Sequence, residues 1–275
     1  MTASSTVSAP VFSAFIFAAV AELLLPIVLL LILCLKHKIS AKPMFLGAAA
    51  FFVSQMLLRM PILQALGTQS WFKAFALNFI PYAAVLAVTA GLFEESARYL
   101  FAGGFLKNQR AFRDALAFGL GHGFCEVILL TGMAQINNII YTVMINNGTI
   151  GTITSKLPAA TSQQLLATML AVKPEMVYIG VLERVFAATF HVFATVLIFK
   201  GLNEHKIRYY FLAIAAHAVL DFGAVSLSHY VNIWASEGFA FAVALVALFF
   251  IFKMKPSFKL ETTGKGNYED IVKQQ

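Results

Sequence analysis

Apolar segments long enough to cross a lipid bilayer recur along this chain, and they leave few folds open to it. The first occupies residues 10–35, and a transmembrane helix needs about 20 apolar residues. Charged residues make up 12% of the sequence and hydrophobic residues 60%, whereas a soluble domain carries about 25% charged residues. The pattern predicts an all-α fold, a polytopic membrane helix bundle that forms an integral, multi-pass membrane protein.

About seven transmembrane helices are expected, at residues 10–35, 44–66, 73–106, 111–144, 174–199, 209–231 and 236–252. The third segment is longer than one span needs and has Pro81 near its start, so part of it should be tilted or interfacial. The fourth segment also exceeds the bilayer thickness at about 1.5 Å per residue. We therefore expect a break in it near Gly132.

Residues 1–252 are expected to form a single transmembrane helical domain. It includes an extracytoplasmic loop at residues 146–173, in which residues 162–170 have the pattern of a short amphipathic helix at the membrane interface. Residues 253–275 form a polar cytoplasmic tail, which is expected to be disordered.

The basic residues predict how the chain is oriented. Most of the 20 Lys and Arg residues lie near four junctions that share one side of the membrane if there are seven spans, at Lys36, Lys107, Lys200 and Lys253. The positive-inside rule then places the N-terminus outside and the C-terminus in the cytoplasm. Loop orientation explains the net charge of +7, so no nucleic-acid partner is expected.

Residues 91–100 place three charges, those of Glu94, Glu95 and Arg98, inside the third apolar segment. A charged residue at the bilayer centre costs about 2.5–3.5 kcal/mol on insertion scales, so such residues are rare and usually functional. Glu94 and Arg98 are four residues apart and share one helical face. An internal salt bridge between them is the structural alternative to a catalytic role.

Three histidines on other segments lie at the depth of Arg98. Arg98 and these histidines each lie nine positions from a basic residue at a membrane junction, a distance of about 14 Å along a helix. The histidines are His122, His191 and His217. Carboxylates follow one turn further from the cytoplasm: Glu94, Glu126 and Asp221, with Glu22 at a similar level. Glu126 is expected to orient His122. Glu183 is expected to support the layer from its outer side, paired with Arg184.

The acidic side chains of this layer outnumber its arginines, and such an excess charge is unstable in a low-dielectric interior. Protonated carboxylates, histidinium or a divalent metal can offset it. Three neutral imidazoles plus a water form a known catalytic zinc arrangement, so His122, His191 and His217 are candidate ligands and zinc is the first choice of metal. Glu94 or Glu95 would then take a proton from the bound water. Without a metal, a glutamate and a histidine can activate the water directly.

Three short motifs resemble those of a family of membrane proteases. They are Glu94-Glu95-Ser96-Ala97-Arg98, Phe118-Gly119-Leu120-Gly121-His122 and His217-Ala218-Val219-Leu220-Asp221, which are similar to the EE…R, FxxxH and HxxxN/D motifs of the CAAX-prenyl-protease and bacteriocin-processing (CPBP) intramembrane proteases. The GHGFCE run at 121–126 and the pair Glu183 and His191 are closer to the bacterial YhfC branch, which is classed as intramembrane metalloproteases. The seven-span layout with the N-terminus outside also resembles the APH subunit of gamma-secretase, a non-catalytic relative.

The resemblance covers roughly residues 93–222. It implies that Glu94 or Glu95 activates water, that His122 and His217 act on the same water or on a metal, and that Asp221 orients them. It also implies a location in a bacterial plasma membrane. The sequence departs from the prenyl-protease pattern in having EExxR instead of EExxxR, which moves the arginine about 100° around the helix. In addition, Asp221 stands where many members have Asn.

Three functions remain open at this point. The first is an intramembrane endopeptidase, metal- or glutamate-dependent, that cleaves a peptide or membrane-protein substrate while surrounded by membrane lipid. The second is a non-enzymatic scaffold that resembles the APH subunit. The third is a proton- or ion-coupled transporter, because buried carboxylates and histidines also serve as relay groups. Transporters usually show two related halves, and the sequence has no evident internal repeat, which disfavours the third.

Overall fold

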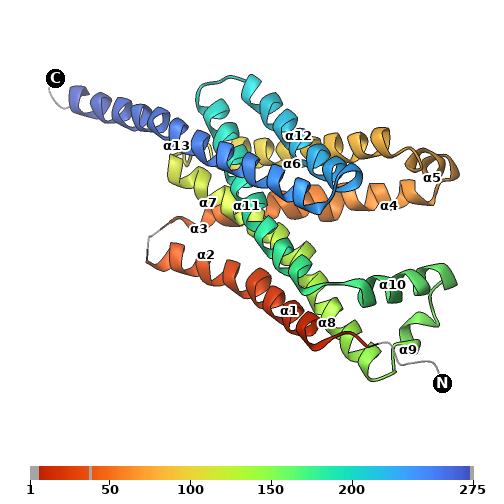
Figure 1. The fold of residues 1–275 in the computed structure, drawn as a ribbon. Coiled ribbons are helices and arrows are strands. Elements are labelled where there is room, and N and C mark those ends of the chain that lie inside the picture. Colours follow the sequence, from red (N-terminus) through yellow and green to blue (C-terminus); the bar gives the residue numbers. More distant parts are fainter. Residues whose placement is uncertain (1–5, 37–38, 273–275) are drawn as a thin grey trace. The chain divides into compact units, whose positions relative to one another are not determined.

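The computed structural model describes the backbone of residues 6–36 and 39–272, and the side chains of these residues up to Phe258. Every regular element in that part of the chain is a helix (Figure 1), which confirms the all-α class. Within these described residues, six helices are long and apolar enough to cross a membrane, and the number rises to seven if a bent helix pair counts as one further span. The chain is therefore a multi-pass integral membrane protein. Its orientation in the membrane stays a prediction.

Three of the spans consist of two α-helices joined by a π-helical segment. They are α1 (Ala9–Ala19), η1 (Val20–Leu24) and α2 (Leu25–Leu35); α3 (Ala41–Phe51), η2 (Phe52–Arg59) and α4 (Met60–Thr68); and α7 (Phe112–Glu126), η3 (Val127–Gly132) and α8 (Met133–Asn146). The i→i+5 hydrogen bonds of such segments interrupt the regular α-helix, and they occur frequently at functional sites. The break expected near Gly132 is therefore a π-helical segment within a continuous span.

The other spans are single helices: α6 (Phe79–Phe105), α11 (Pro174–Asn203), α12 (Arg208–Tyr230) and α13 (Ile233–Val272). The short helix α5 (Ser70–Ala76) meets α6 at an angle of 106°, so part of the third segment does lie outside the straight span. In the loop, α9 (Gly151–Thr154) precedes α10 (Ala159–Ala171), and α10 includes the predicted amphipathic helix.

The tail differs from the prediction. The helix α13 continues through Phe258, and Met254 and Phe258 are buried, so the expectation of disorder is wrong for residues 253–258. Nucleation is the costly step of helix formation, and each further residue adds one hydrogen bond. A long apolar helix that is already formed can therefore extend into a polar segment that would not nucleate a helix by itself.

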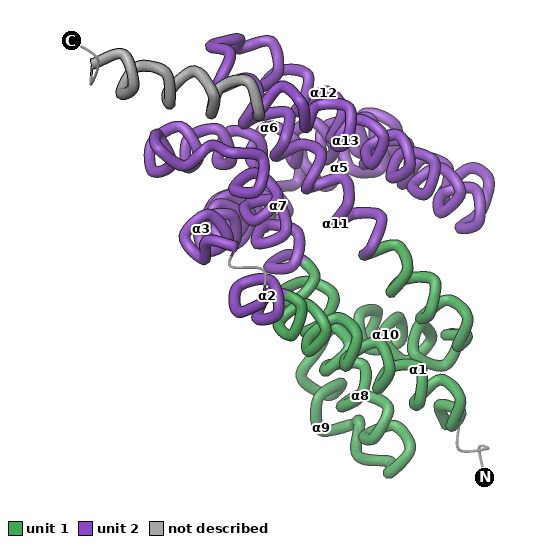
Figure 2. Tube along the Cα trace, turned by 90° about the vertical axis from the view of Figure 1, so that its left-hand side faces the viewer, with its two compact units in different colours: residues 1–29, 127–184 green, residues 30–126, 185–275 purple. Residues whose placement is uncertain are grey.

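The chain divides into two compact units, Met1–Leu29 with Val127–Arg184 (unit 1) and Leu30–Glu126 with Val185–Gln275 (unit 2) (Figure 2). In unit 1, a small hydrophobic core includes Phe15, Ile145 and Met169. Unit 2 holds the larger core and most of the intramembrane charges. The single transmembrane domain proposed for residues 1–252 stays a prediction.

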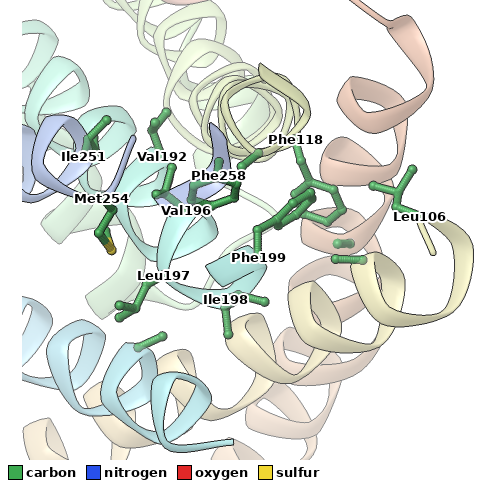
Figure 3. Packing of buried hydrophobic residues seen from close by; sticks show 14 of the residues in the cluster. Leu106, Phe118, Val192, Val196, Leu197, Ile198, Phe199, Ile251, Met254 and Phe258 are labelled. Carbon is green, nitrogen blue, oxygen red and sulfur yellow. The ribbon is translucent and has the colours of Figure 1, made fainter. Parts of the chain in front are cut away.

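The core of unit 2 packs around α7 and α11. Phe118 of α7 and Phe199 of α11 meet edge to face, with ring centroids 5.7 Å apart, and Figure 3 shows them next to each other. Leu106, Ile198 and Met254 belong to the same buried cluster. This apolar packing holds the two helices that carry His122 and His191.

Glycines let α7 approach its neighbours on two sides. A Cβ atom on Gly121 would lie 2.0 Å from the carbonyl oxygen of Met44 in α3, and one on Gly47 would lie 2.0 Å from that of Phe118. On the other side, a Cβ on Gly119 would lie 2.7 Å from Cα of Val192 in α11. Small residues commonly allow such close contacts between membrane helices. His122 therefore sits on a stretch of α7 that is held tightly between α3 and α11.

This packing predicts a large effect for Gly121→Ala. The new methyl group would meet backbone atoms, which no rotamer change can move, so we expect a loss of about 3 kcal/mol of unfolding free energy. Thermal unfolding of the purified protein in detergent measures the effect. Gly104→Ala is the matched control, because nothing lies within 4 Å of its new Cβ. Equal melting temperatures for Gly121→Ala and the wild type would contradict the packing described here.

Candidate active site

Glu94 lies at the centre of a buried polar cluster in unit 2. Its Oε2 is 2.9 Å from Nε2 of His122 and 3.8 Å from Nδ1 of His191. Its Oε1 is 4.0 Å from Nε2 of His217. The four residues come from α6, α7, α11 and α12, and all four are buried. The structure thus brings together four side chains that lie far apart in the sequence.

Glu95 and Arg98 form a second, fully buried part of this cluster. The Arg98 guanidinium makes an ion pair with the Glu95 carboxylate, and both side chains have no exposed surface. Oε1 of Glu95 is also 2.9 Å from Nδ1 of His217. Arg98 therefore pairs with Glu95, and the alternative of a salt bridge between Glu94 and Arg98 is not what the structure has. The oxygens of Glu94 are already engaged by other side chains, and Glu95, three residues before Arg98, is the acid that Arg98 reaches.

Glu126 and Asp221 contact the histidines of this cluster. Oε2 of Glu126 lies 2.5 Å from Nε2 of His191, so Glu126 orients His191 and the prediction that it orients His122 is wrong. The reason is that this part of α7 packs against α11, where a Cβ on Gly123 would lie 3.5 Å from Cβ of His191. Oδ2 of Asp221 lies 3.6 Å from Nε2 of His217, which is beyond hydrogen-bonding distance.

The partners of His191 and His217 decide which ring nitrogen carries a proton. Arg98 can only donate, and its Nη2 lies 3.1 Å from Nδ1 of His191, so Nδ1 accepts and the ring proton sits on Nε2, which faces Oε2 of Glu126. For His217, Nδ1 donates to the ionised Glu95. Nε2 of His217 is then left with a lone pair on the side that faces Glu94 and Asp221.

The same reasoning applies to His122. Its Nε2 contacts Glu94, and its Nδ1 is buried without a hydrogen-bond partner among the described residues. A buried N–H without an acceptor is rarer than an unpaired acceptor. This favours the tautomer in which Nε2 donates to the Glu94 carboxylate and Nδ1 keeps a lone pair.

The structure offers a group that can hold a metal ion, and its members differ from the predicted three histidines. One ligand atom from each of Glu94, His191 and His217 lies within 4.8 Å of the others. Two imidazoles and one carboxylate are the ligand set of several catalytic zinc sites. His122 is not part of this group; its Nε2 lies 2.9 Å from Oε2 of Glu94.

The surroundings of this group also fit a divalent cation. Metal-bound histidines usually donate their second nitrogen to a carboxylate or carbonyl. His217 is hydrogen-bonded to Glu95 in this way, and Nε2 of His191 lies within ion-pair distance of the Glu126 carboxylate. The cluster has two more carboxylates than guanidinium groups. The carboxylates are those of Glu94, Glu95, Glu126 and Asp221, and the guanidinium groups are those of Arg59 and Arg98. One contact opposes a metal, since Arg98 donates to the lone pair of His191 that faces Glu94. A metal on that nitrogen must displace Arg98.

Two residues of the cluster were not anticipated from the sequence. Nε2 of Gln55 lies 2.7 Å from Oε1 of Glu94, and Nη1 of Arg59 lies 3.1 Å from Oε1 of Gln55. Both residues belong to η2. A Gln and an Arg four residues apart inside an apolar segment are the sequence signal that could have found them.

Glu183 and Glu22 have their described contacts within unit 1. Glu183 forms an ion pair with Arg184, as expected. Glu22 lies on η1 with only 2% of its surface exposed, and its carboxylate is close to the side chains of Thr131 and Gln135. The supporting role of Glu183 stays a prediction.

Comparison with known proteins gives the family. The model of the YhfC intramembrane metalloprotease family matches residues 21–240. A protein of Bacillus subtilis (strain 168), described as "Uncharacterized membrane protein YhfC", is 30% identical over 246 residues, which are 86% of this chain and 93% of that protein. No solved structure matches. The resemblance to the CPBP proteases and to the APH subunit is not shown by these matches and stays a prediction. Because both matches span most of the chain, it belongs to the YhfC intramembrane metalloprotease family.

Proposed function

We propose that this protein is an intramembrane endopeptidase that hydrolyses a peptide bond of a peptide or membrane-protein substrate inside the bilayer. The observation that carries the proposal is the buried Glu94 carboxylate surrounded by three histidines from three other helices. The family description supports the same reaction class. A carboxylate and imidazoles at one point are the groups that water activation requires.

The roles of the residues follow from their contacts. The Glu94–His122 pair takes the proton of the attacking water, because the pair is joined by a hydrogen bond and His122 keeps a free lone pair on Nδ1. The water oxygen forms a bond to the peptide carbonyl carbon, and the C–N bond then breaks. The same pair returns the proton to the leaving amine nitrogen, which completes the hydrolysis.

A divalent metal would be held by Glu94, His191 and His217, with zinc as the first choice given two nitrogen ligands and one oxygen ligand. When bound, it would supply a Lewis acid that polarises the carbonyl and acidifies water. Glu95 and Glu126 would hold the two ligating histidines in place through their second nitrogens. Both carboxylates are thus assigned to orientation.

The test is hydrolysis in proteoliposomes by the purified protein, with a mixture of synthetic single-span peptides in H2¹⁸O. Mass spectrometry should find new C-termini that carry one ¹⁸O atom each. Glu94→Gln should form them about 10²- to 10⁴-fold more slowly. Glu175→Gln, which changes an exposed carboxylate at the start of α11, should cleave at the wild-type rate. Equal cleavage by wild type and Glu94→Gln would exclude the proposal.

The scaffold alternative makes the opposite prediction. It is favoured by the fully buried Glu95–Arg98 ion pair, which ties adjacent turns of α6 and also reaches α11 and α12. If the cluster only holds helices together, substitution of Glu94 should reduce folding yield and thermal stability. Under the proposed function, Glu94→Gln should fold normally and lose turnover.

A further inference from the structure

Arg59 and Gln55 form a chain of hydrogen bonds that ends on Glu94. We propose that Gln55, fixed by Arg59, is a positioning residue that holds the Glu94 carboxylate in its reactive orientation. This inference rests on the proposed function, since it assigns new residues to the same reaction. It concerns side chains of η2, a segment outside the three sequence motifs.

Arg59 is anchored on α6. Its Nη2 donates to the carbonyl oxygen of Leu86 at 2.7 Å, and its Nε lies 3.3 Å from Oγ1 of Thr89. Its Nη1 donates to Oε1 of Gln55 at 3.1 Å. A guanidinium group has several donors in a rigid, planar fork. The three contacts from three different nitrogens therefore fix where its donor to Gln55 points.

The anchored arginine determines the orientation of the Gln55 amide. The oxygen and nitrogen of a glutamine side chain are nearly indistinguishable by shape, so their assignment must follow from the hydrogen-bond network. Arg59 can only donate, so the atom of Gln55 that faces it must be the oxygen. The amide nitrogen then faces Glu94, where it donates to Oε1 at 2.7 Å.

Glu94 is consequently held at both oxygens. Gln55 donates to Oε1 and His122 to Oε2. The terminal torsion of a glutamate is broad when nothing restrains it, so these two contacts select one plane for the carboxylate. Gln55 is only 4% exposed, and no bulk water can replace its donor. Loss of Gln55 would leave Oε1 without this partner and free the carboxylate to rotate.

The test uses Gln55→Met, which keeps the length of the side chain and removes the amide. With the cleaved single-span peptide as substrate, we expect kcat to fall about 10- to 100-fold, the range known for residues that orient metal ligands. KM should stay within about twofold, because Gln55 contacts Glu94 and no expected substrate group. Gln64→Met, an exposed glutamine of α4, is the matched control and should behave as wild type.

A double-mutant cycle tests whether Arg59 acts through Gln55. Arg59→Met should lower kcat in the same direction, and the double variant Gln55→Met with Arg59→Met should be no slower than Gln55→Met alone. If the fall in kcat of the double variant equals the product of the two single falls, Arg59 has a separate role and the proposed chain of contacts is wrong. If Arg59→Met fails to fold, Thr89→Val removes one anchor of Arg59 and should give a smaller loss of kcat.

A second readout does not depend on turnover. Titration of the purified metal-free protein with Zn²⁺ should show about 10- to 100-fold weaker binding for Gln55→Met than for wild type. The outcomes separate the two proposals. If Glu94→Gln is inactive while Gln55→Met matches wild type in both kcat and Zn²⁺ affinity, the positioning role is wrong and the proposed function stands. If Glu94→Gln is fully active, the proposed function itself fails.

Discussion

Glu94→Gln is expected to lower the rate of peptide hydrolysis by about 10²- to 10⁴-fold, the usual contribution of a general acid–base group. The substitution keeps the size of the side chain and removes its charge and its basic oxygen. It also removes one of the three atoms that can hold a metal. Turnover of the single-span peptide in proteoliposomes measures the effect, and circular dichroism with thermal unfolding checks that the variant is folded.

Glu95→Gln provides the comparison that makes this result specific. Its carboxylate is the counter-ion of the Arg98 guanidinium, and neither side chain has exposed surface. Removing one partner of a buried ion pair typically costs about 3–5 kcal/mol, because the other charge is left uncompensated. Glu95→Gln should therefore lose stability, whereas Glu94→Gln should lose turnover at nearly normal stability. If the two variants behaved alike, the division of roles between the adjacent glutamates would be wrong.

Counting residues from the basic junctions was enough to predict which helices carry the cluster. Arg98, His122, His191 and His217 share one depth, because depth depends only on the rise per residue of a helix. The structure brings the four into one cluster in unit 2. The counting also placed the carboxylates in a separate layer, one turn away. In the structure, Glu94 reaches all three histidines, because side chains are long enough to span one turn.

Partner choice could not be predicted in the same way. Whether Arg98 meets Glu94 or Glu95, and whether Glu126 meets His122 or His191, depends on how each helix is rotated about its axis. Rotation is set by packing, such as the contact of Gly121 with α3 and of Gly119 with α11. A single sequence shows that these glycines are small, but it does not show which neighbour approaches each of them.

Gln55 was missed for a different reason. Gln55 carries no charge, and a single uncharged amide in an apolar segment does not by itself indicate a functional site. The structure turns the Arg59 guanidinium toward α6 and Gln55. Both residues belong to the π-helical segment η2. The regular spacing assumed for the whole span does not describe such a segment.

Metal analysis should separate the two possible ligand sets. His217→Ala and His191→Ala are each expected to reduce bound zinc from about one ion per chain to almost none, because a site with three protein ligands rarely tolerates the loss of one. His122→Ala should retain the ion, since the structure groups Glu94 with His191 and His217 only. The effect of His122→Ala should instead appear as a lower rate of peptide hydrolysis. Inductively coupled plasma mass spectrometry of each purified variant, after equilibration with Zn²⁺ and removal of the excess, measures the stoichiometry.

The result for His122 carries the most information. Loss of zinc in His122→Ala would support three histidine ligands and would free Glu94 to act as the base alone. Retention of zinc with loss of turnover would support the Glu94–His122 pair as the group that handles the proton. His229→Ala is the matched control, because His229 stacks on Phe79 and belongs to no candidate ligand group among the described residues. Zinc absent from the wild type as well would leave the water to be activated by Glu94 and His122 directly. Arg98, which already donates to Nδ1 of His191, would then supply the positive charge beside them.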